Sequence, residues 1–306
     1  MQEIAKVAIF GAGAMGSFFA AKFFDTDGFS TVLVARGERR ERLMKNGLIV
    51  NGKRYDVLVV HPDKSLETAD LIIVALKHHQ LVEAIQDLKN IVGDSTTIIS
   101  VMNGLESEEM LANAYGWDKM LYCVSVGIDA LREGNALTYT MPGKHFFGEA
   151  VNTQISERVK RVQRAFDRAG IAHETPEDMI RIMWWKFMIN VGMNQSSAVM
   201  RANYGVFRES MDARALMKAL MQEVIDVAKA AGVNLQEKDI DDWEKFLISL
   251  SSEGKTSMFQ DIEAGRKTEV EIFGGKMVNM GKKYSIPTPV NETMLRIIRV
   301  LEQYPA

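Results

Sequence analysis

Three polar side chains recur at intervals of four residues within a largely apolar stretch of the sequence. They are Lys186, Asn190 and Asn194, and on a helix this spacing places all three on one face. A buried lysine must be paired or have a lowered pKa, and buried amide groups need hydrogen-bond partners. The pattern therefore predicts a site for a small oxygen-rich anion, with a polar seam between packed helices as the alternative.

A second group of candidate residues lies between Lys255 and Glu269. Thr256 or Ser257 is expected to cap the N-terminus of the helix that follows, because hydroxyl side chains are favoured there. The hydroxyl of Ser257 could also bind a carboxylate at that helix N-terminus. From its sequence context alone, Glu269 is interpreted as a solvent-exposed residue of the same helix.

A glycine-rich turn near the N-terminus has the spacing of a dinucleotide-binding loop. It follows a short predicted strand, Lys6–Phe10, and opens a predicted helix, which is the structural context that this motif requires. The first glycine permits a tight turn, the second lets the backbone approach a pyrophosphate, and the third lets helix and strand pack closely. The candidate cofactor-binding residues here are Gly11, Ala12, Gly13, Ala14, Met15 and Gly16.

The end of the second predicted strand distinguishes between the two nicotinamide cofactors. An NAD site normally has an acidic residue there for the ribose 2′-hydroxyl, whereas this chain has Arg36, which could bind a 2′-phosphate. We therefore expect NADP(H), with an exposed loop charge as the alternative. Lys77 and Asn103 follow two further predicted strands, at the edge of the sheet where ligands bind, although each could be an ordinary turn residue.

The elements that would position these residues alternate between strand and helix in the first half of the chain. This order predicts an α/β fold with an N-terminal Rossmann-type doubly wound sheet. Asn51-Gly52 predicts a hairpin, and polar–apolar alternation from Ala136 to Phe147 predicts an antiparallel extension of the sheet. The expected strands are 6–10, 31–35, 70–76, 96–101, 120–126 and 171–174, and the expected helices are 14–24, 38–45, 81–91, 106–114 and 153–169.

The second half of the chain has helical periodicity and predicts a C-terminal all-helical domain. The expected helices are 180–200, 210–231, 239–251 and 257–284. The change in composition places the boundary near residues 174–178. We therefore predict an NADP-binding Rossmann domain over residues 1–175 and a helical substrate-binding and catalytic domain over residues 176–306, with the active site in the cleft between them.

Composition argues against several classes of protein. The chain has 306 residues and a net charge of −3, so it lacks the basic field of a nucleic-acid binder. No apolar run reaches the ~18 residues that span a membrane. Cys123 is the single cysteine, and we interpret it as a buried core residue. These features predict a cytoplasmic protein without a metal site, a nucleic-acid partner or a membrane partner.

Several motifs together resemble the ketopantoate reductase (2-dehydropantoate 2-reductase) family, and they occur in the family's order over nearly the whole chain. MNGLESEE at 102–109 and TSMFQDIEAGRKTEVE at 256–271 are the most specific. The resemblance implies reduction of the C2 ketone of ketopantoate by NADPH, giving (R)-pantoate for pantothenate and coenzyme A biosynthesis. The other motifs are GAGAMG at 11–16, LKHHQ at 76–80, KFMINVGMNQ at 186–195 and IPTPVN at 286–291.

The resemblance also implies roles for individual residues. Lys186 corresponds to the general acid that protonates the developing alkoxide, and Glu269 to the acidic residue that orients the substrate and supports that lysine. Arg36 matches the 2′-phosphate position, and Lys77 and Gln80 belong to the cofactor-side motif. The residues implied to hold the substrate are Asn103 (which also contacts the cofactor), Asn190, Asn194, Ser257 and Asn203.

Two alternatives remain open from the sequence. One is an NADPH-dependent reductase of another 2-keto acid or of an imine, which would use the same residues. The other is a non-catalytic NADP(H)-binding regulator, which would have no need for a proton donor at the hydride acceptor. The expected partners are a small-molecule substrate and, through exposed apolar faces of the C-terminal helices, a second copy of the chain in a homodimer.

Overall fold

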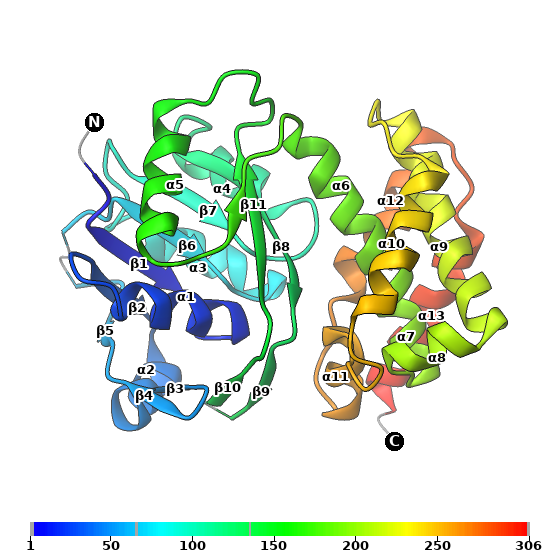
Figure 1. Cartoon of the computed structure of the whole chain (residues 1–306), viewed down its shortest axis with the longest axis horizontal. Helices are drawn as coiled ribbons and strands as arrows, with labels where there is room; N and C mark the ends of the chain where they lie inside the picture. The colour runs from blue at the N-terminus through cyan, green and yellow to red at the C-terminus, as the bar shows by residue number, and fades with distance from the viewer. Residues whose placement is uncertain (1–2, 65–66, 135, 305–306) are drawn as a thin grey trace. The chain divides into compact units, whose positions relative to one another are not determined.

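The computed structural model describes residues 3–64, 67–134 and 136–304 (Figure 1). The chain forms two compact units. The first comprises Met1–Met102 and Glu106–Ile182, and the second comprises Asn103–Leu105 and Met183–Ala306. The first unit has an α/β architecture and the second is built of helices, as the sequence predicts for its two halves.

The first unit is built on an eight-stranded sheet in which six neighbouring strands run parallel. β1 (Lys6–Phe10) lies between β2 (Ser30–Val34) and β6 (Leu71–Val74), and the order of connection reverses between β1 and β6. Such a reversal is where open α/β sheets bind ligands, and the predicted doubly wound sheet is confirmed. The other strands are β5 (Leu58–Val60), β7 (Thr97–Ser100), β8 (Met120–Ile128), β11 (Pro142–Gly148) and β12 (His173–Glu174), in the order β12-β11-β8-β7-β6-β1-β2-β5.

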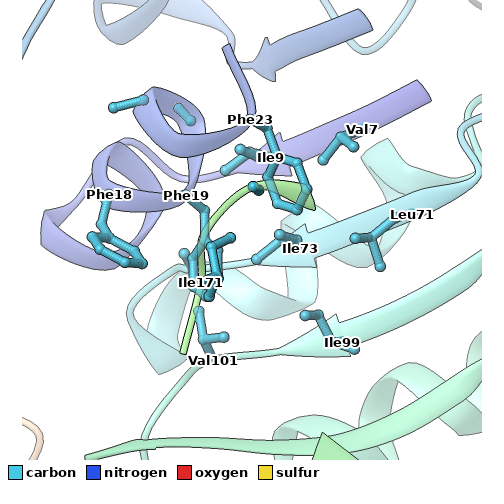
Figure 2. Packing of buried hydrophobic residues seen from close by; sticks show 14 of the residues in the cluster. Val7, Ile9, Phe18, Phe19, Phe23, Leu71, Ile73, Ile99, Val101 and Ile171 are labelled. Atoms are coloured by element: carbon cyan, nitrogen blue, oxygen red, sulfur yellow. The ribbon is translucent and has the colours of Figure 1, made fainter. Parts of the chain in front are cut away.

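Helices cover both faces of this sheet, as its nearly continuous apolar strands require. They are α1 (Ala14–Phe24), α2 (Gly37–Asn46), α3 (Leu81–Leu88), α4 (Ser107–Tyr115) and α5 (Glu157–Arg168). Successive residues of a strand point to opposite faces. Val7 and Ile9 therefore belong to one core with Phe residues of α1 (Figure 2), which residues of α5 also join. Ala8 and Phe10 belong to another core with α3 and α4.

A second, four-stranded sheet contains the hairpin predicted around Asn51-Gly52. Both turn residues have positive φ, and the flanking strands pair in antiparallel register. The hairpin prediction is therefore confirmed. The strands of this sheet are β3 (Leu48–Val50), β4 (Lys53–Tyr55), β9 (Leu131–Glu133) and β10 (Ala136–Thr138), in the order β4-β3-β10-β9.

The predicted antiparallel extension of the main sheet is only partly correct. β11 pairs antiparallel with β8 as expected, but β10 pairs with β9 and β3 instead. The chain turns at Gly134, which has positive φ, so β10 folds back on β9. Asp129 then accepts hydrogen bonds from the backbone N–H groups of Thr140 and Met141, at 2.8 and 2.7 Å, and this turn separates β10 from β11.

The C-terminal part of the chain is helical. Its elements are α6 (Met179–Ile189), η2 (Asn190–Asn194), α7 (Gln195–Met200), α8 (Tyr204–Glu209), α9 (Met211–Ala230), α10 (Glu237–Ser249), α11 (Ser257–Glu263), η3 (Val270–Ile272), α12 (Gly274–Tyr284) and α13 (Pro289–Gln303). Across the described ranges, no helix combines the length and the apolar composition needed to span a membrane. Two of the predicted helices prove to be interrupted, one at Asn190–Asn194 and the other before Glu269.

The predicted helix over 180–200 contains η2, a single π-helical turn, between α6 and α7. Close packing against α9 accompanies this turn. A Cβ atom on Gly192 would lie 2.4 Å from Cγ of Met221 and 3.1 Å from the carbonyl oxygen of Met217. The absence of a side chain at Gly192 therefore allows the π turn to approach α9.

The predicted continuous helix over 257–284 is wrong, because the chain breaks after α11. Gly265 has φ +60. Its N–H donates to the Ile262 carbonyl at 3.1 Å, and the next N–H, from Arg266, donates to the Asp261 carbonyl at 2.8 Å. This pair of bonds is the Schellman ending of a helix. Glu269 consequently lies beyond the helix rather than within it.

Candidate active site

The glycine-rich loop joins β1 to α1 at the switch point of the sheet. Gly11 has φ +100, and a Cβ atom there would lie 2.2 Å from the carbonyl oxygen of Ala75. A Cβ atom on Gly16 would lie 1.7 Å from the carbonyl oxygen of Gly11. Neither position has room for a side chain, so the loop depends on glycine for the steric reasons that define the motif.

Gly13 differs from these two glycines because it leaves space at the N-terminus of α1. The nearest atoms to a Cβ there would be the Ala75 carbonyl oxygen and Nη1 of Arg132, both at 3.8 Å. Gly13 is the N-cap residue and supplies no side-chain cap, and the first turn of α1 carries no acidic residue. Backbone N–H groups at this helix end suit phosphate oxygens, so the loop fits the pyrophosphate of a dinucleotide.

Arg132 is a candidate cofactor-binding residue that the sequence analysis missed. It lies on β9, and its guanidinium approaches the glycine-rich loop while its Nε donates to the Gly134 carbonyl at 3.0 Å. A guanidinium group beside a phosphate-binding turn favours an anionic ligand. The sequence signal is slight, because Arg132 comes near α1 through the pairing of β9 with β10 and of β10 with β3, which link distant segments.

Arg36 follows β2, as expected, but carboxylates surround its guanidinium group. It forms an ion pair with Asp87, and its Nη atoms lie 3.7 Å from both Asp63 and Glu83. The Asp87 side chain is 12% exposed, whereas that of Arg36 is 40% exposed. Burial raises the pKa of Asp87, an effect that the nearby Arg36 partly offsets. Arg36 is therefore already paired at the position where a 2′-phosphate is predicted to bind.

Lys77 and Gln80 lie at the short helical turn η1 (His78–Gln80), which follows β6 at the carboxyl edge of the sheet. The side-chain oxygen of Gln80 accepts a hydrogen bond from the backbone N–H of Lys77 at 3.3 Å. Gln80 therefore stabilises the turn itself. The Lys77 side chain is half-buried beside the switch-point strand.

Lys186, on α6, has surroundings unlike those of Arg36. Its side chain is half-buried, and none of the described residues forms an ion pair or a hydrogen bond with its Nζ. Burial lowers the pKa of this ammonium group to about 8. A pKa near neutrality suits a group that must hold a proton and then release it.

A chain of hydrogen bonds in the second unit joins three of the predicted site residues. Asn190 Nδ2 donates to Asn103 Oδ1 at 3.2 Å, and Asn103 Nδ2 donates to Glu269 Oε2 at 3.0 Å. Asn190 is buried, whereas Asn103 and Glu269 are half-buried. The expectation that Glu269 is an exposed helix residue is wrong, because the break at Gly265 places it at the start of η3 instead.

The π turn η2 influences whether Asn194 lies on the same helix face as Lys186 and Asn190. In an α-helix, a step of four residues overshoots one full turn by about 40°. A π turn rotates less per residue because its hydrogen bonds span five residues, so it offsets that overshoot between Asn190 and Asn194. Asn194 is buried, and its side-chain amide makes no hydrogen bond to any residue that the structure describes.

Two further predicted substrate residues lie at helix N-termini. Thr256 caps α11 by accepting a hydrogen bond from the Phe259 N–H at 3.2 Å, so the exposed hydroxyl of Ser257 is not needed for capping. Asn203 caps α8 through the Val206 N–H at 3.3 Å. The structure thus gives Asn203 a structural role, whereas Ser257 has a hydroxyl available for a ligand.

Cys123, the single cysteine, lies on β8 in the interior of the first unit. It is fully buried, and burial raises the pKa of its thiol. The prediction that it belongs to the core is confirmed. Among residues 3–64, 67–134 and 136–304, no group of three or more His, Cys, Asp or Glu side chains is arranged to hold a metal ion.

Two family models match the chain. The model described as ketopantoate reductase PanE/ApbA matches residues 7–152, and the C-terminal model of the same family matches residues 178–302. The chain belongs to the ketopantoate reductase family. The first match contains the glycine-rich loop, Arg36 and Asn103, and the second contains Lys186 and Glu269.

Relatives and solved structures cover nearly the whole of this family member. A 2-dehydropantoate 2-reductase from Archaeoglobus fulgidus is 28% identical over 300 residues, covering 98% of this chain and 99% of the relative. A ternary structure of D-mandelate dehydrogenase with NADH and anilino(oxo)acetate has a TM-score of 0.89 at 21% identity, covering 97% of this chain and 98% of that chain. The 2-dehydropantoate 2-reductase of Geobacter metallireducens GS-15 has a TM-score of 0.86 at 24% identity, covering 96% and 99%. Membership of the family makes the chain an oxidoreductase.

Proposed function

We propose that this oxidoreductase reduces ketopantoate (2-dehydropantoate) to (R)-pantoate with NADPH, and so serves pantothenate and coenzyme A biosynthesis. The observation that carries the proposal is the Lys186 ammonium group, which is half-buried, unpaired among the described residues, and lowered in pKa to about 8. Relatives named 2-dehydropantoate 2-reductase, 25–28% identical over nearly the full length, support the choice of substrate.

A nicotinamide cofactor follows from the family, and the residues of the first unit fit a dinucleotide. The glycine-rich loop would hold the pyrophosphate, with Arg132 beside it. Arg36 would contact the 2′-phosphate of NADPH, because it follows β2 at the position that distinguishes the two cofactors. A bound reduced nicotinamide supplies a hydride to carbon C2 of the keto acid.

Lys186 supplies the matching proton in this mechanism. Its Nζ donates a proton to the C2 oxygen, so the ketone becomes a hydroxyl group and the amine regains a proton from solvent. Before transfer, the positive charge stabilises the negative charge that develops on the oxygen. Because burial weakens the hold of Nζ on its proton, transfer is easier than from a fully solvated lysine.

The hydrogen-bonded amides would orient the substrate. Glu269 can only accept hydrogen bonds when ionised, so its contact with Nδ2 fixes the amide of Asn103, and that in turn fixes Asn190. The side chains of Asn194 and Ser257 retain donors that suit the carboxylate and hydroxyl groups of a hydroxylated keto acid.

The decisive experiment follows the loss of NADPH absorbance with purified protein and ketopantoate, beside a panel of other 2-keto acids. The panel includes the aryl 2-keto acid that corresponds to mandelate, in view of the structural neighbour. We expect ketopantoate to be reduced fastest. Faster reduction of another 2-keto acid would identify that acid as the substrate and would leave the proposed mechanism unchanged. Tight NADPH binding without turnover of any acid would contradict the proposed reaction and favour a non-catalytic regulator.

A further inference from the structure

Arg36 and three acidic residues form a compact group of charges in the first unit. The group, called the Arg36 cluster below, comprises Arg36, Asp63, Glu83 and Asp87. Its members come from three segments: the turn after β2, the loop after β5, and α3. With one cation and three carboxylates, the cluster carries more negative than positive charge at neutral pH.

The three carboxylates differ in how strongly solvent screens them. The Asp87 side chain is 12% exposed and forms a direct ion pair with Arg36, whereas those of Glu83 and Asp63 are 68% and 69% exposed and lie 3.7 Å away. Water and salt screen the outer pair of charges, but they screen the buried Asp87 much less. Asp87 is therefore the acidic residue with the greatest influence on what Arg36 can bind.

This environment affects the two nicotinamide cofactors differently. A ribose 2′-phosphate carries about −1.5 to −2 charges at pH 7, so it must compete with Asp87 for the donors of Arg36 while the remaining carboxylates repel it. A ribose 2′-hydroxyl carries no charge, and it can donate a hydrogen bond to a carboxylate. The Arg36 cluster therefore penalises NADPH relative to an unpaired arginine, and it does not penalise NADH.

We propose that Asp87, assisted by Glu83 and Asp63, sets cofactor specificity by competing with the 2′-phosphate for Arg36, so that the protein binds NADPH and NADH with affinities within about tenfold of each other. The inference rests on the proposed function to the extent that both place a nicotinamide dinucleotide on the glycine-rich loop. It goes further because the position of Arg36 alone predicts a strong preference for NADPH.

The test measures the dissociation constants of NADPH and NADH by nicotinamide fluorescence, without any keto acid. Asp87→Asn removes the charge while keeping the size of the side chain. We expect it to tighten NADPH binding about tenfold and to change NADH binding less than about twofold. The matched control is Asp94→Asn, which removes an equal charge from an exposed residue before β7, at the opposite edge of the sheet, and leaves both constants unchanged.

A second variant tests the proposal even if Asp87→Asn fails to fold. Glu83→Gln alters an exposed side chain on α3, so it preserves folding, and we expect about threefold tighter NADPH binding because solvent screens this carboxylate. Thermal melting of each variant checks that the fold is retained. A progressive gain from Glu83→Gln to Asp87→Asn would support the competition that we propose.

Three outcomes would overturn the proposal. They are a wild-type preference for NADPH of about a hundredfold or more, an unchanged NADPH-to-NADH ratio in folded Asp87→Asn, and failure of the wild type to bind either nucleotide. Only the last outcome also removes the cofactor of the proposed function. Conversely, binding of both nucleotides without reduction of any keto acid would contradict the proposed reaction while supporting the role of Asp87.

Discussion

Arg36 and Lys186 are two cations at candidate ligand sites, and their surroundings are opposite. Arg36 pairs with Asp87 and has two further carboxylates 3.7 Å away, whereas Lys186 is unpaired among the described residues. A paired guanidinium must exchange partners to bind a ligand, and a desolvated ammonium without a partner holds its proton weakly. Arg36 is therefore suited to binding an anionic ligand, whereas Lys186 is suited to transferring a proton.

The largest effect on activity is expected when Lys186 is replaced by arginine, the residue type present at position 36. Lys186→Arg keeps the positive charge, but a guanidinium group remains protonated at any accessible pH. We expect kcat to fall by about 10²–10⁴ in steady-state assays, while the dissociation constant of NADPH is unchanged. Lys283→Arg, an exposed change on α12, is the control with full activity. Normal turnover by Lys186→Arg would show that this residue is not the acid.

The pH dependence of the wild type tests the same distinction with a smaller change in rate. The protonated form of Lys186 is the active one, and its pKa is about 8. We therefore expect kcat/KM to be level below about pH 8 and to fall about tenfold per unit above it. A profile that stays level well beyond pH 9 would mean that Lys186 keeps an ordinary lysine pKa or is not the acid.

Removal of Arg36 tests the binding side of the comparison. Arg36→Ala is expected to weaken NADPH binding about tenfold and to leave NADH binding nearly unchanged, because only the 2′-phosphate needs the guanidinium group. Titration of both nucleotides by fluorescence gives the two constants. If the ratio of the NADPH and NADH dissociation constants stays the same, Arg36 does not bind the cofactor and is only an exposed surface charge.

The smallest effect concerns stability. Replacement of an unpaired, desolvated ammonium group by an apolar side chain of similar length, as in Lys186→Met, is expected to raise the free energy of unfolding by about 1 kcal/mol. The gain is greatest below about pH 8, where folded and unfolded chains are both protonated, and it disappears as the pH rises toward the ordinary value of 10.5. Urea unfolding at pH 7 and pH 10 measures the gain.

Arg36→Met provides the contrast for this stability measurement. It removes the ion-pair partner of Asp87, whose side chain is largely buried, so no gain in stability is expected. If Lys186→Met and Arg36→Met stabilise the protein equally, an unpaired Lys186 and an ion-paired Arg36 do not differ in their contribution to stability.

The features that depend on local backbone conformation were predictable from the sequence. The glycine-rich turn and the hairpin at Asn51-Gly52 follow from backbone conformations that few residues tolerate. The helix break at Gly265 has the same kind of signal, but helical periodicity resumes farther along the chain and favours one continuous helix. Gly265 followed by Arg266 and Lys267 is a helix-ending signal, and it indicates that Glu269 lies outside the helix.

Contacts between distant segments were beyond the reach of the sequence. Asn103 and Glu269 are separated by 166 positions, and no local pattern pairs an amide with a carboxylate across that distance. The carboxylates around Arg36 were missed for a related reason. Asp63 comes close because β5 joins the main sheet parallel to β2, and no local pattern indicates this pairing.

The buried position of Cys123 has a practical consequence for labelling the protein in solution. The chain has one cysteine, and its thiol is inaccessible to alkylating reagents because it is 0% exposed. A new cysteine at Val82 on α3 or at Ile248 on α10, which are 66% and 68% exposed, would therefore react selectively. Spectroscopic labels can be attached to each unit without first replacing the native cysteine.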